Sequence, residues 1–184
     1  NPDIEDVNNI LSLCRPFQPE LILAAGGGSV LDTAKSVCHG YFYDGDPLDF
    51  NKHLVTPLHA LPLATIITLS ASGSERSDSC VISDRMHHFK GGFNSVTNYP
   101  LFSLEDPSLT FSVPPYQLGC GLSDRFSHSF ERYCSPSHEL EPCDGLALSI
   151  RKSVVSITNR VLAKADDREA KRARRICGSL SHDG

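Results

Sequence analysis

The chain has 184 residues, of which 40% are hydrophobic and 21% charged, and its formal net charge is -5. This size and composition are typical of a globular protein with one domain, or with one domain and part of another. The acidic balance excludes a general nucleic-acid binder, because phosphate binding requires an excess of Lys and Arg on one face.

Several segments give expectations about where the protein is located and whether its chain is processed. The only dense basic run, Lys171 to Arg175, is interpreted as a solvated helix face. No apolar run approaches the ~20 residues of a membrane helix. The N-terminus is acidic, unlike a signal peptide, and lacks an initiator Met, so we expect a chain that is processed or cut from something longer. The seven scattered cysteines predict reduced, mostly buried thiols in a cytoplasmic protein.

The first third of the chain predicts alternating helices and strands. Apolar residues recur at helical spacing over residues 3–14, and Pro16 and Pro19 end this helix. Residues 21–25 form a short continuous apolar run, which is typical of a buried parallel strand. Three glycines and a predicted helix over residues 29–41 follow. This order is the unit of a doubly wound sheet.

The remainder predicts more strands and then helices only. Residues 61–69 form a second apolar run rich in β-branched side chains, and residues 79–83 and 99–104 predict further short strands. After Pro115 the pattern becomes helical, over residues 116–133, 140–163 and 166–177. We therefore predict an α/β domain with a parallel sheet over residues 1–114 and a helical domain that begins over residues 115–184.

The first motif with chemical meaning is the glycine turn between the first strand and its helix. It reads Gly26-Gly27-Gly28-Ser29, with Asp32 and Lys35 further along. Glycines let the backbone approach an anion closely, and a helix N-terminus adds N–H donors and a partial positive charge. The turn therefore suits a phosphate or pyrophosphate. The alternative is a tight strand-to-helix turn in which Ser29 is the N-cap.

A second motif is the cluster of hydroxyl groups at the end of the second apolar run, from Thr65 to Glu75. Ligands bind outside the strand ends of open α/β sheets, so these groups could hold the ribose, phosphate or carboxamide of a cofactor. The alternative is a Ser-rich loop that only closes the strand.

The third motif is Asp124 followed by His128. A spacing of four places both side chains on one helix face, one turn apart. A carboxylate and an imidazole so placed can share one divalent ion, and mixed O and N ligands suit Fe(II) or Zn(II). The alternative is a hydrogen bond between the two side chains on a helix surface.

In this order the three stretches resemble the iron-containing alcohol dehydrogenase family, most closely its butanol-dehydrogenase-like branch. The resemblance runs almost end to end and extends to residues 43–47, 106–110, 113–115 and 121–133. It implies a Rossmann-like nucleotide domain and a helical metal-binding domain, the dehydroquinate-synthase-like architecture, with the active site in the cleft between them. Residues 1–114 would then lack the first strand–helix unit, whose earlier glycine motif helps to choose between NAD and NADP.

The resemblance also implies roles for individual residues. Asp124 and His128 would be metal ligands for Fe(II), with Zn(II) possible, and would act in catalysis through the metal. Two further histidine ligands of the family lie beyond the chain, and His138 and His182 match no ligand motif. Nine residues would contact NAD or NADP: Gly27, Gly28, Ser29 and Asp32 along the cofactor, Thr65, Thr68, Leu69 and Ser72 lining its pocket, and Lys90 near its ribose.

The implied activity is that of an oxidoreductase that transfers a hydride reversibly between a primary alcohol, such as butanol, and the nicotinamide. The metal would act as a Lewis acid on the alcohol or aldehyde oxygen. The implied partner is a small alcohol or aldehyde, with no nucleic acid and no membrane, and the full-length family implies a cytoplasmic homo-oligomer, a dimer. Two alternatives stay open: an inactive remnant that only binds nucleotide, and an enzyme of the related glycerol-dehydrogenase or dehydroquinate-synthase type.

Two departures from the family pattern weaken particular expectations. After Glu75 the family usually has an Asn followed closely by Gly, whereas this chain has Arg-Ser-Asp-Ser over residues 76–79. Arg125 replaces a usual small residue beside the first metal ligand, where it would lie either on the outer helix face or in the cleft.

An α/β domain without its first unit would expose apolar surface, so we expect the isolated chain to self-associate.

Overall fold

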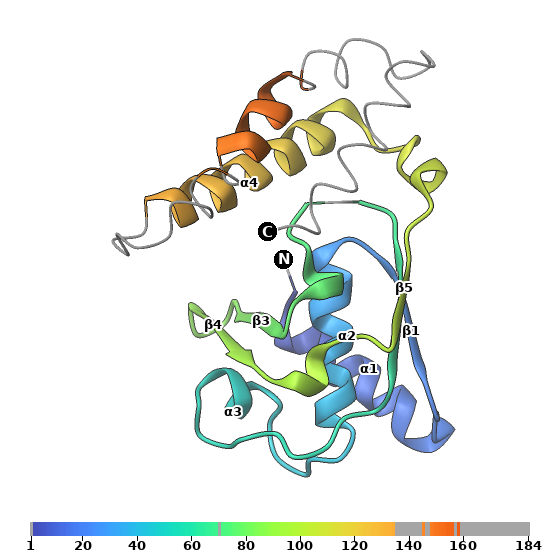
Figure 1. Cartoon of the computed structure of the whole chain (residues 1–184). Coiled ribbons are helices and arrows are strands. Elements are labelled where there is room, and N and C mark those ends of the chain that lie inside the picture. Colours follow the sequence, from blue (N-terminus) through green and yellow to red (C-terminus); the bar gives the residue numbers. More distant parts are fainter. Residues whose placement is uncertain (1, 70, 135–144, 146–147, 157, 159–184) are drawn as a thin grey trace. The chain divides into compact units, whose positions relative to one another are not determined.

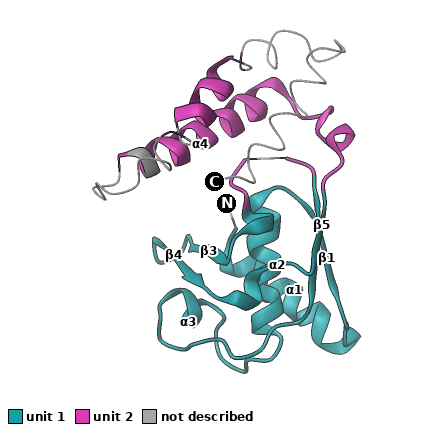
Figure 2. Cartoon of the chain, viewed as in Figure 1, with its two compact units in different colours: residues 1–67, 74–104 teal, residues 68–73, 105–184 magenta. Residues whose placement is uncertain are grey.

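The computed structural model describes residues 2–69, 71–134, 145, 148–156 and 158. The chain divides into two compact units (Figure 2). Unit 1 consists of residues 1–67 and 74–104, and unit 2 consists of residues 68–73 and 105–184. The chain therefore leaves unit 1 after Ile67 and returns to it at Ser74.

Unit 1 is built on a parallel sheet of three strands, in the order β1-β2-β5 (Figure 1). The strands are β1 (Ile22–Gly26), β2 (Leu63–Ile67) and β5 (Phe102–Leu104). In their register Ala24 pairs with Thr65, and Thr65 pairs with Ser103. The expected α/β class with a parallel sheet is confirmed. The third strand is shorter than the predicted range 99–104, because Tyr99 is still the C-cap of the 3-10 turn η2 (Val96–Asn98) and Pro100 has no N–H to donate to a neighbouring strand.

Three helices belong to unit 1. In α1 (Ile4–Phe17) the carboxylate of the N-cap Asp3 accepts a hydrogen bond from the Glu5 backbone N–H. This helix includes Pro16 and ends at Phe17, because the C-cap Gln18 has a left-handed φ of 52°, so the expected end before Pro16 is wrong. The second helix, α2 (Gly28–Gly40), follows β1 directly, and α3 (Leu48–Asn51) is a single turn.

A separate hairpin completes unit 1. The strands β3 (Ser79–Asp84) and β4 (Phe89–Asn94) pair antiparallel and form their own two-stranded sheet. The first of them was expected from the sequence. The second was not, because its sequence Phe-Lys-Gly-Gly-Phe-Asn contains Gly and Lys, which strands disfavour, and lacks β-branched side chains.

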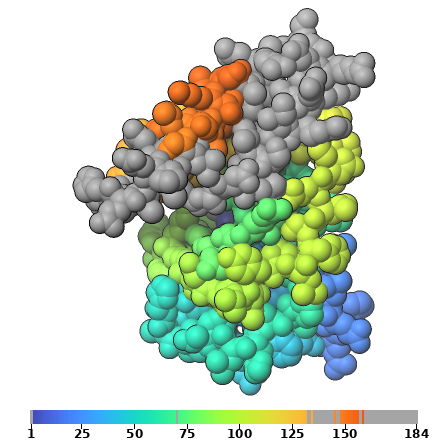
Figure 3. All heavy atoms as spheres, viewed as in Figure 1, coloured from blue at the N-terminus to red at the C-terminus, as the bar shows by residue number. Residues whose placement is uncertain are grey.

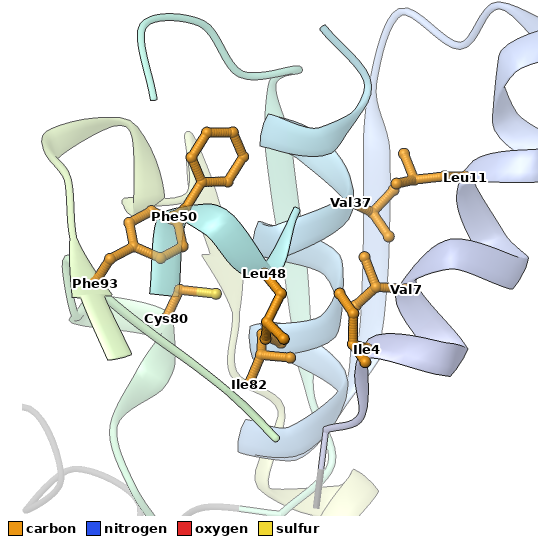
Figure 4. Packing of buried hydrophobic residues seen from close by; sticks show 9 residues of the cluster. All are labelled: Ile4, Val7, Leu11, Val37, Leu48, Phe50, Cys80, Ile82 and Phe93. Carbon is orange, nitrogen blue, oxygen red and sulfur yellow. The ribbon is translucent and has the colours of Figure 1, made fainter. Parts of the chain in front are cut away.

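Two apolar clusters hold these elements together. One lies between α2 and the parallel sheet and includes Leu31, Leu63 and Ile67. The other joins α1 and α2 to α3 and the hairpin (Figure 4). It consists of Ile4, Val7, Leu11, Val37, Leu48, Phe50, Cys80, Ile82 and Phe93. Helix α2 contributes to both clusters, so it is the central element of the unit.

Beyond residue 106, the described part of unit 2 is mainly helical. A 3-10 turn, η3 (Pro107–Thr110), precedes α4 (Pro115–Tyr133), as the sequence predicts for residues 116–133. Residues 148–156 are helical as well, within the predicted helix 140–163, and Arg151 stacks over the ring of Phe130. The predicted helix 166–177, His138, His182 and the basic run at 171–175 lie outside the described residues.

Two further expectations concern membrane helices and cysteines. None of the helices in the described part of the chain is long and apolar enough to cross a bilayer. The five described cysteines are free thiols, as expected, and Cys38 and Cys80 are buried. Cys120 and Cys134 are exposed, so the expectation of mostly buried thiols is wrong for these two, which lie on and just after the largely exposed helix α4.

One face of the parallel sheet is apolar and open. Helix α2 packs on the opposite face. Leu23, Ala64 and Phe102 form a cross-strand row on the open face, and Leu104 lies in the next row. Leu23, Phe102 and Leu104 are each more than half exposed. Figure 3 shows the segment that carries β5 on the surface. Parallel sheets are usually covered on both faces.

We therefore expect the isolated chain to self-associate through this sheet face. Replacing Leu23 and Phe102 together by Thr introduces β-branched residues, which favour strands, and removes the apolar contact area, so the fraction of oligomer in analytical ultracentrifugation should fall severalfold. Thr at the exposed Leu58 and Val96, which lie off the sheet, is the matched control and should leave it unchanged. A wild-type chain that sediments as a single monomer would contradict the prediction.

His39 of α2 is buried beside Phe50 and Phe93. Its Nδ1 lies 3.1 Å from the carbonyl oxygen of His59, and its Nε2 lies 3.0 Å from Oδ1 of Asn98. Burial lowers the pKa of His39 below its ordinary value of 6.5 and outweighs the two hydrogen bonds, which favour the charged form. The imidazole therefore lies between the His59 backbone and η2, and in its neutral form it donates its single N–H to one of these two oxygens.

This predicts a loss of stability in mild acid. The unfolded chain takes up the proton near pH 6.5, before the folded chain does, so the free energy of unfolding falls as the pH drops below that value. His39→Gln should reduce this slope, by at most about 1.4 kcal/mol per pH unit for one proton. The exposed His53→Gln is the control. Equal slopes for wild type and His39→Gln, in urea unfolding at pH 5 to 7, would refute the assignment.

Candidate functional site

The glycine turn lies at the carboxyl end of β1 in unit 1. A Cβ atom at Gly26 would lie 2.6 Å from the side chain of Val30, so the chain can turn this tightly into α2 only with glycine there. Gly27 is the N-cap of α2, Gly28 is its first residue, and Ser29 is exposed in the first turn. The alternative that Ser29 is the N-cap is therefore wrong.

The N-terminus of α2 has the features of an anion site. No side chain caps it, and its first turn contains no acidic residue. The first intrahelical bonds run from the N–H groups of Val30 and Leu31 to the carbonyl of Gly27. The preceding N–H groups, at Gly28 and Ser29, belong to the free first turn of a helix, where a phosphate group binds well.

Asp32 lies in the next turn of α2, and its carboxylate is engaged inside the protein. One oxygen accepts a hydrogen bond from the Ser74 hydroxyl at 2.6 Å, and the other accepts from the Val81 N–H at 3.1 Å. Burial raises the pKa of Asp32, although the Ser74 hydrogen bond, the Lys35 charge and the Val81 hydrogen bond all oppose the rise. In this structure Asp32 holds the segment 74–81, and its contact with a cofactor stays a prediction.

Lys35 lies beneath Asp32 and is only 1% exposed. Its Nζ donates to the carbonyl oxygens of Ser74, Ser77 and Ser79 and to the Ser74 hydroxyl, at 2.8–3.0 Å. Burial lowers the pKa of Lys35, and the negative charge of Asp32 is the largest of the opposing effects. The glycine motif alone indicated no role for this lysine. The spacing of three between Asp32 and Lys35, which places them on one helix face, was the available signal.

The other predicted cofactor residues are spread over the chain. Thr65 is buried in β2, and its hydroxyl donates to the Ser103 hydroxyl of β5 at 2.7 Å, so it connects two strands. Thr68, Leu69 and Ser72 belong to unit 2, where the first two are half-buried and Ser72 is exposed. Lys90 is exposed on β4, opposite Ser83 of β3. The structure thus brings together Asp32 and Lys35 of α2 and Ser74, which belongs to the hydroxyl cluster predicted to follow the second apolar run.

The predicted metal ligands lie one turn apart on α4, in unit 2. Oδ1 of Asp124 is 3.6 Å from Nε2 of His128, which is too long for a hydrogen bond. The two side chains are 45% and 55% exposed, so both donor atoms remain accessible. Within the described residues, no three His, Cys, Asp or Glu side chains gather closely enough to hold an ion. A carboxylate and an imidazole fit half of a divalent-metal site.

The buried face of α4 adjoins this pair. Leu122, Arg125 and Ser129 are buried and recur at spacings of three and four. Arg125 therefore does not lie on the outer face of the helix, so the first of the two positions expected for this residue is excluded. On the other side of the buried face, the rings of Phe126 and Phe130 stack with their centroids 6.3 Å apart.

A family model, related sequences and solved structures all match the chain to the same family of proteins. The family model for iron-containing alcohol dehydrogenases matches residues 1–107. NADH-dependent butanol dehydrogenase A of Clostridium acetobutylicum is 37% identical over 184 residues, which are 100% of this chain and 47% of that protein. The NADPH-dependent aldehyde reductase YqhD of Escherichia coli K12 is 29% identical over 178 residues, 91% of this chain and 44% of that protein.

Solved structures agree with this. The crystal structure of NADH-dependent butanol dehydrogenase A from Thermotoga maritima matches with a TM-score of 0.91 at 32% identity, over 100% of this chain and 46% of that one. That of sulfoacetaldehyde reductase from Bifidobacterium kashiwanohense in complex with NAD+ matches with a TM-score of 0.87 at 26% identity, over 99% and 47%. The chain spans about half the length of the curated relatives it matches. With a matching family model and relatives alike in sequence and fold, it belongs to the iron-containing alcohol dehydrogenase family.

Proposed function

We propose that the protein is a metal-dependent, NAD(P)-linked alcohol dehydrogenase or aldehyde reductase that acts on primary alcohols such as butanol. The observation that carries this proposal is the uncapped N-terminus of α2 behind a glycine turn at a strand end. Residues 1–114 are the dinucleotide-binding domain in this proposal, and residues 115–184 begin the metal-binding domain. The enzyme is cytoplasmic and homo-oligomeric, a dimer.

The α2 turn binds the dinucleotide through its phosphates. Gly27 and Gly28 allow close approach of the backbone, Ser29 adds an exposed hydroxyl, and the helix supplies a partial positive charge. Thr65, Thr68, Leu69, Ser72, Asp32 and Lys90 complete the proposed set of cofactor residues. The relatives' names include NADH-dependent and NADPH-dependent enzymes, which supports a nicotinamide cofactor of either kind.

The ion is Fe(II), or Zn(II), with Asp124 and His128 as two of its ligands. A carboxylate and an imidazole supply the mixed O and N donors that such ions accept, and both side chains are accessible on α4. A bound ion of this kind supplies Lewis-acid polarisation of the alcohol or aldehyde oxygen. The contribution of the chain itself is to orient the nicotinamide and to hold the ion at a fixed place.

The dinucleotide half of the proposal is tested by adding a negative charge at the α2 N-terminus. Ser29→Asp favours the helix dipole, so the stability of unit 1 should not decrease, yet the carboxylate repels phosphate, so the Kd for NADH or NADPH should rise ~10-fold or more. Ser12→Asp adds the same charge at an exposed site on α1 and should leave the Kd unchanged. The readout is nicotinamide fluorescence. A wild-type chain that binds neither nucleotide would refute this half.

The metal half is tested on α4. Equilibrium dialysis against Zn(II) should show one weak site on the wild-type chain, and Asp124→Ala or His128→Ala should abolish it, because each removes one of two donors. Glu131→Ala, which removes another exposed acid of the same helix, is the control and should retain the ion. Unchanged binding in both ligand variants would contradict the assignment. Dinucleotide binding without alcohol turnover, after Fe(II) or Zn(II) is added, would favour a nucleotide-binding remnant.

A further inference from the structure

A fully buried lysine side chain connects the proposed dinucleotide site to the segment that follows β2. Nζ of Lys35 lies 2.8 Å from the Ser74 carbonyl, 2.9 Å from that of Ser77 and 2.8 Å from that of Ser79, and 3.0 Å from the Ser74 hydroxyl. An ammonium group has three protons, so four acceptors at these distances saturate it. All of these atoms belong to unit 1.

The charge of this ammonium is balanced through a hydroxyl bridge. Ser74 donates its proton to Asp32 at 2.6 Å and accepts one from Lys35 at 3.0 Å. The second oxygen of Asp32 accepts from the Val81 N–H. A buried charge is tolerated only when it is paired and hydrogen-bonded, and here both partners meet that condition. The arrangement therefore holds segment 74–81 against α2 at several points.

The arrangement also fixes one end of the loop 68–73. Ile67, just before the loop, pairs with Gly26 in the parallel sheet, and Ser74, just after it, is held by Lys35 and Asp32. A short loop whose two ends are fixed has few conformations to choose from. This loop carries Thr68, Leu69 and Ser72, three of the proposed cofactor residues, and ends at Gly73, which has a φ of 70°.

We propose that Lys35 is a positioning residue for dinucleotide binding: from inside α2, its ammonium fixes Ser74 and thereby the end at which the loop 68–73 returns to unit 1. The inference rests on the proposed function, because it concerns the same cofactor. Lys35 itself is buried and does not touch the ligand. Its effect on binding passes through the segment that begins at Ser74.

The test compares Lys35→Met with a core variant of the same helix. Lys35→Met approximately keeps the length of the side chain and removes every donor, which leaves the three carbonyls without this partner and Asp32 without the nearby positive charge. Val37→Ala also lies in α2 and is buried, but in the cluster with α1. It controls for a general loss of stability, and further truncation at Leu11 can match the fall in Tm.

Two measurements are made on the full 184-residue chain. The first is the Kd for NADH and NADPH by nicotinamide fluorescence. We expect Lys35→Met to raise it ~10-fold or more, and Val37→Ala to change it less than twofold at the same loss in Tm. The second is amide hydrogen exchange, which should accelerate over residues 68–81 in Lys35→Met and not in Val37→Ala.

The outcomes separate this inference from the proposed function. If the wild-type chain binds no dinucleotide, the proposed function fails, and hydrogen exchange alone then decides whether Lys35 positions the loop. Unchanged exchange over residues 68–81, or exchange that accelerates equally in the control, overturns the inference. If Lys35→Met does not fold, Ser74→Ala replaces it, since this variant removes only the bridging hydroxyl. Its Kd should then rise and its exchange over residues 68–81 accelerate, and wild-type values for both would overturn the inference.

Discussion

The buried ammonium of Lys35 is the interaction on which the arrangement of unit 1 depends. It lies in α2, the helix that contributes to both apolar clusters, and it collects three backbone carbonyls from a segment far away in the sequence. Apolar packing alone is not directional and would let this segment shift. Hydrogen bonds from one charged donor fix its position, because each unmade bond would leave a buried polar group without a partner.

The same helix presents its N-terminus at the end of β1. One helix, α2, therefore serves two purposes. Its first turn forms the proposed phosphate site, and its second and third turns hold the segment 74–81. Asp32 connects the two parts of the helix. It lies close to the glycine turn, and its two carboxylate oxygens accept hydrogen bonds from Ser74 and Val81. In unit 2, Asp124 and His128 lie next to the buried face of α4.

The comparisons place the chain that carries both features in one family. The relatives include a butanol dehydrogenase named as NADH-dependent and an aldehyde reductase named as NADPH-dependent, and the chain matches about half of their length. The proposed ligands Asp124 and His128 would make only part of a metal site, and family membership is the reason for proposing that they bind an ion. The open apolar face of the parallel sheet is a property of the described chain alone and bears on how that chain behaves when isolated.

The sequence by itself was sufficient for the elements whose signal is local. The apolar run of β1, the glycine turn, α2 and the Asp–His turn of α4 are all recognisable, because strand burial, backbone freedom and helical spacing are written in adjacent residues. It also determined the family, since several motifs occur in one order. It did not reveal β4, whose glycines and lysine carry no strand signal, and it placed Pro16 outside a helix that in fact includes it.

Only the tertiary structure decided what Asp32, Lys35, Thr65 and Ser74 contact. Each carries a polar group whose partner lies about forty residues away along the chain, as in the pairs Asp32–Ser74, Lys35–Ser74 and Thr65–Ser103. A sequence motif specifies which atoms can donate or accept, but not which of them meet. That is determined by the packing of α2 against the sheet and the hairpin, because burial forces every such group to find a partner within reach.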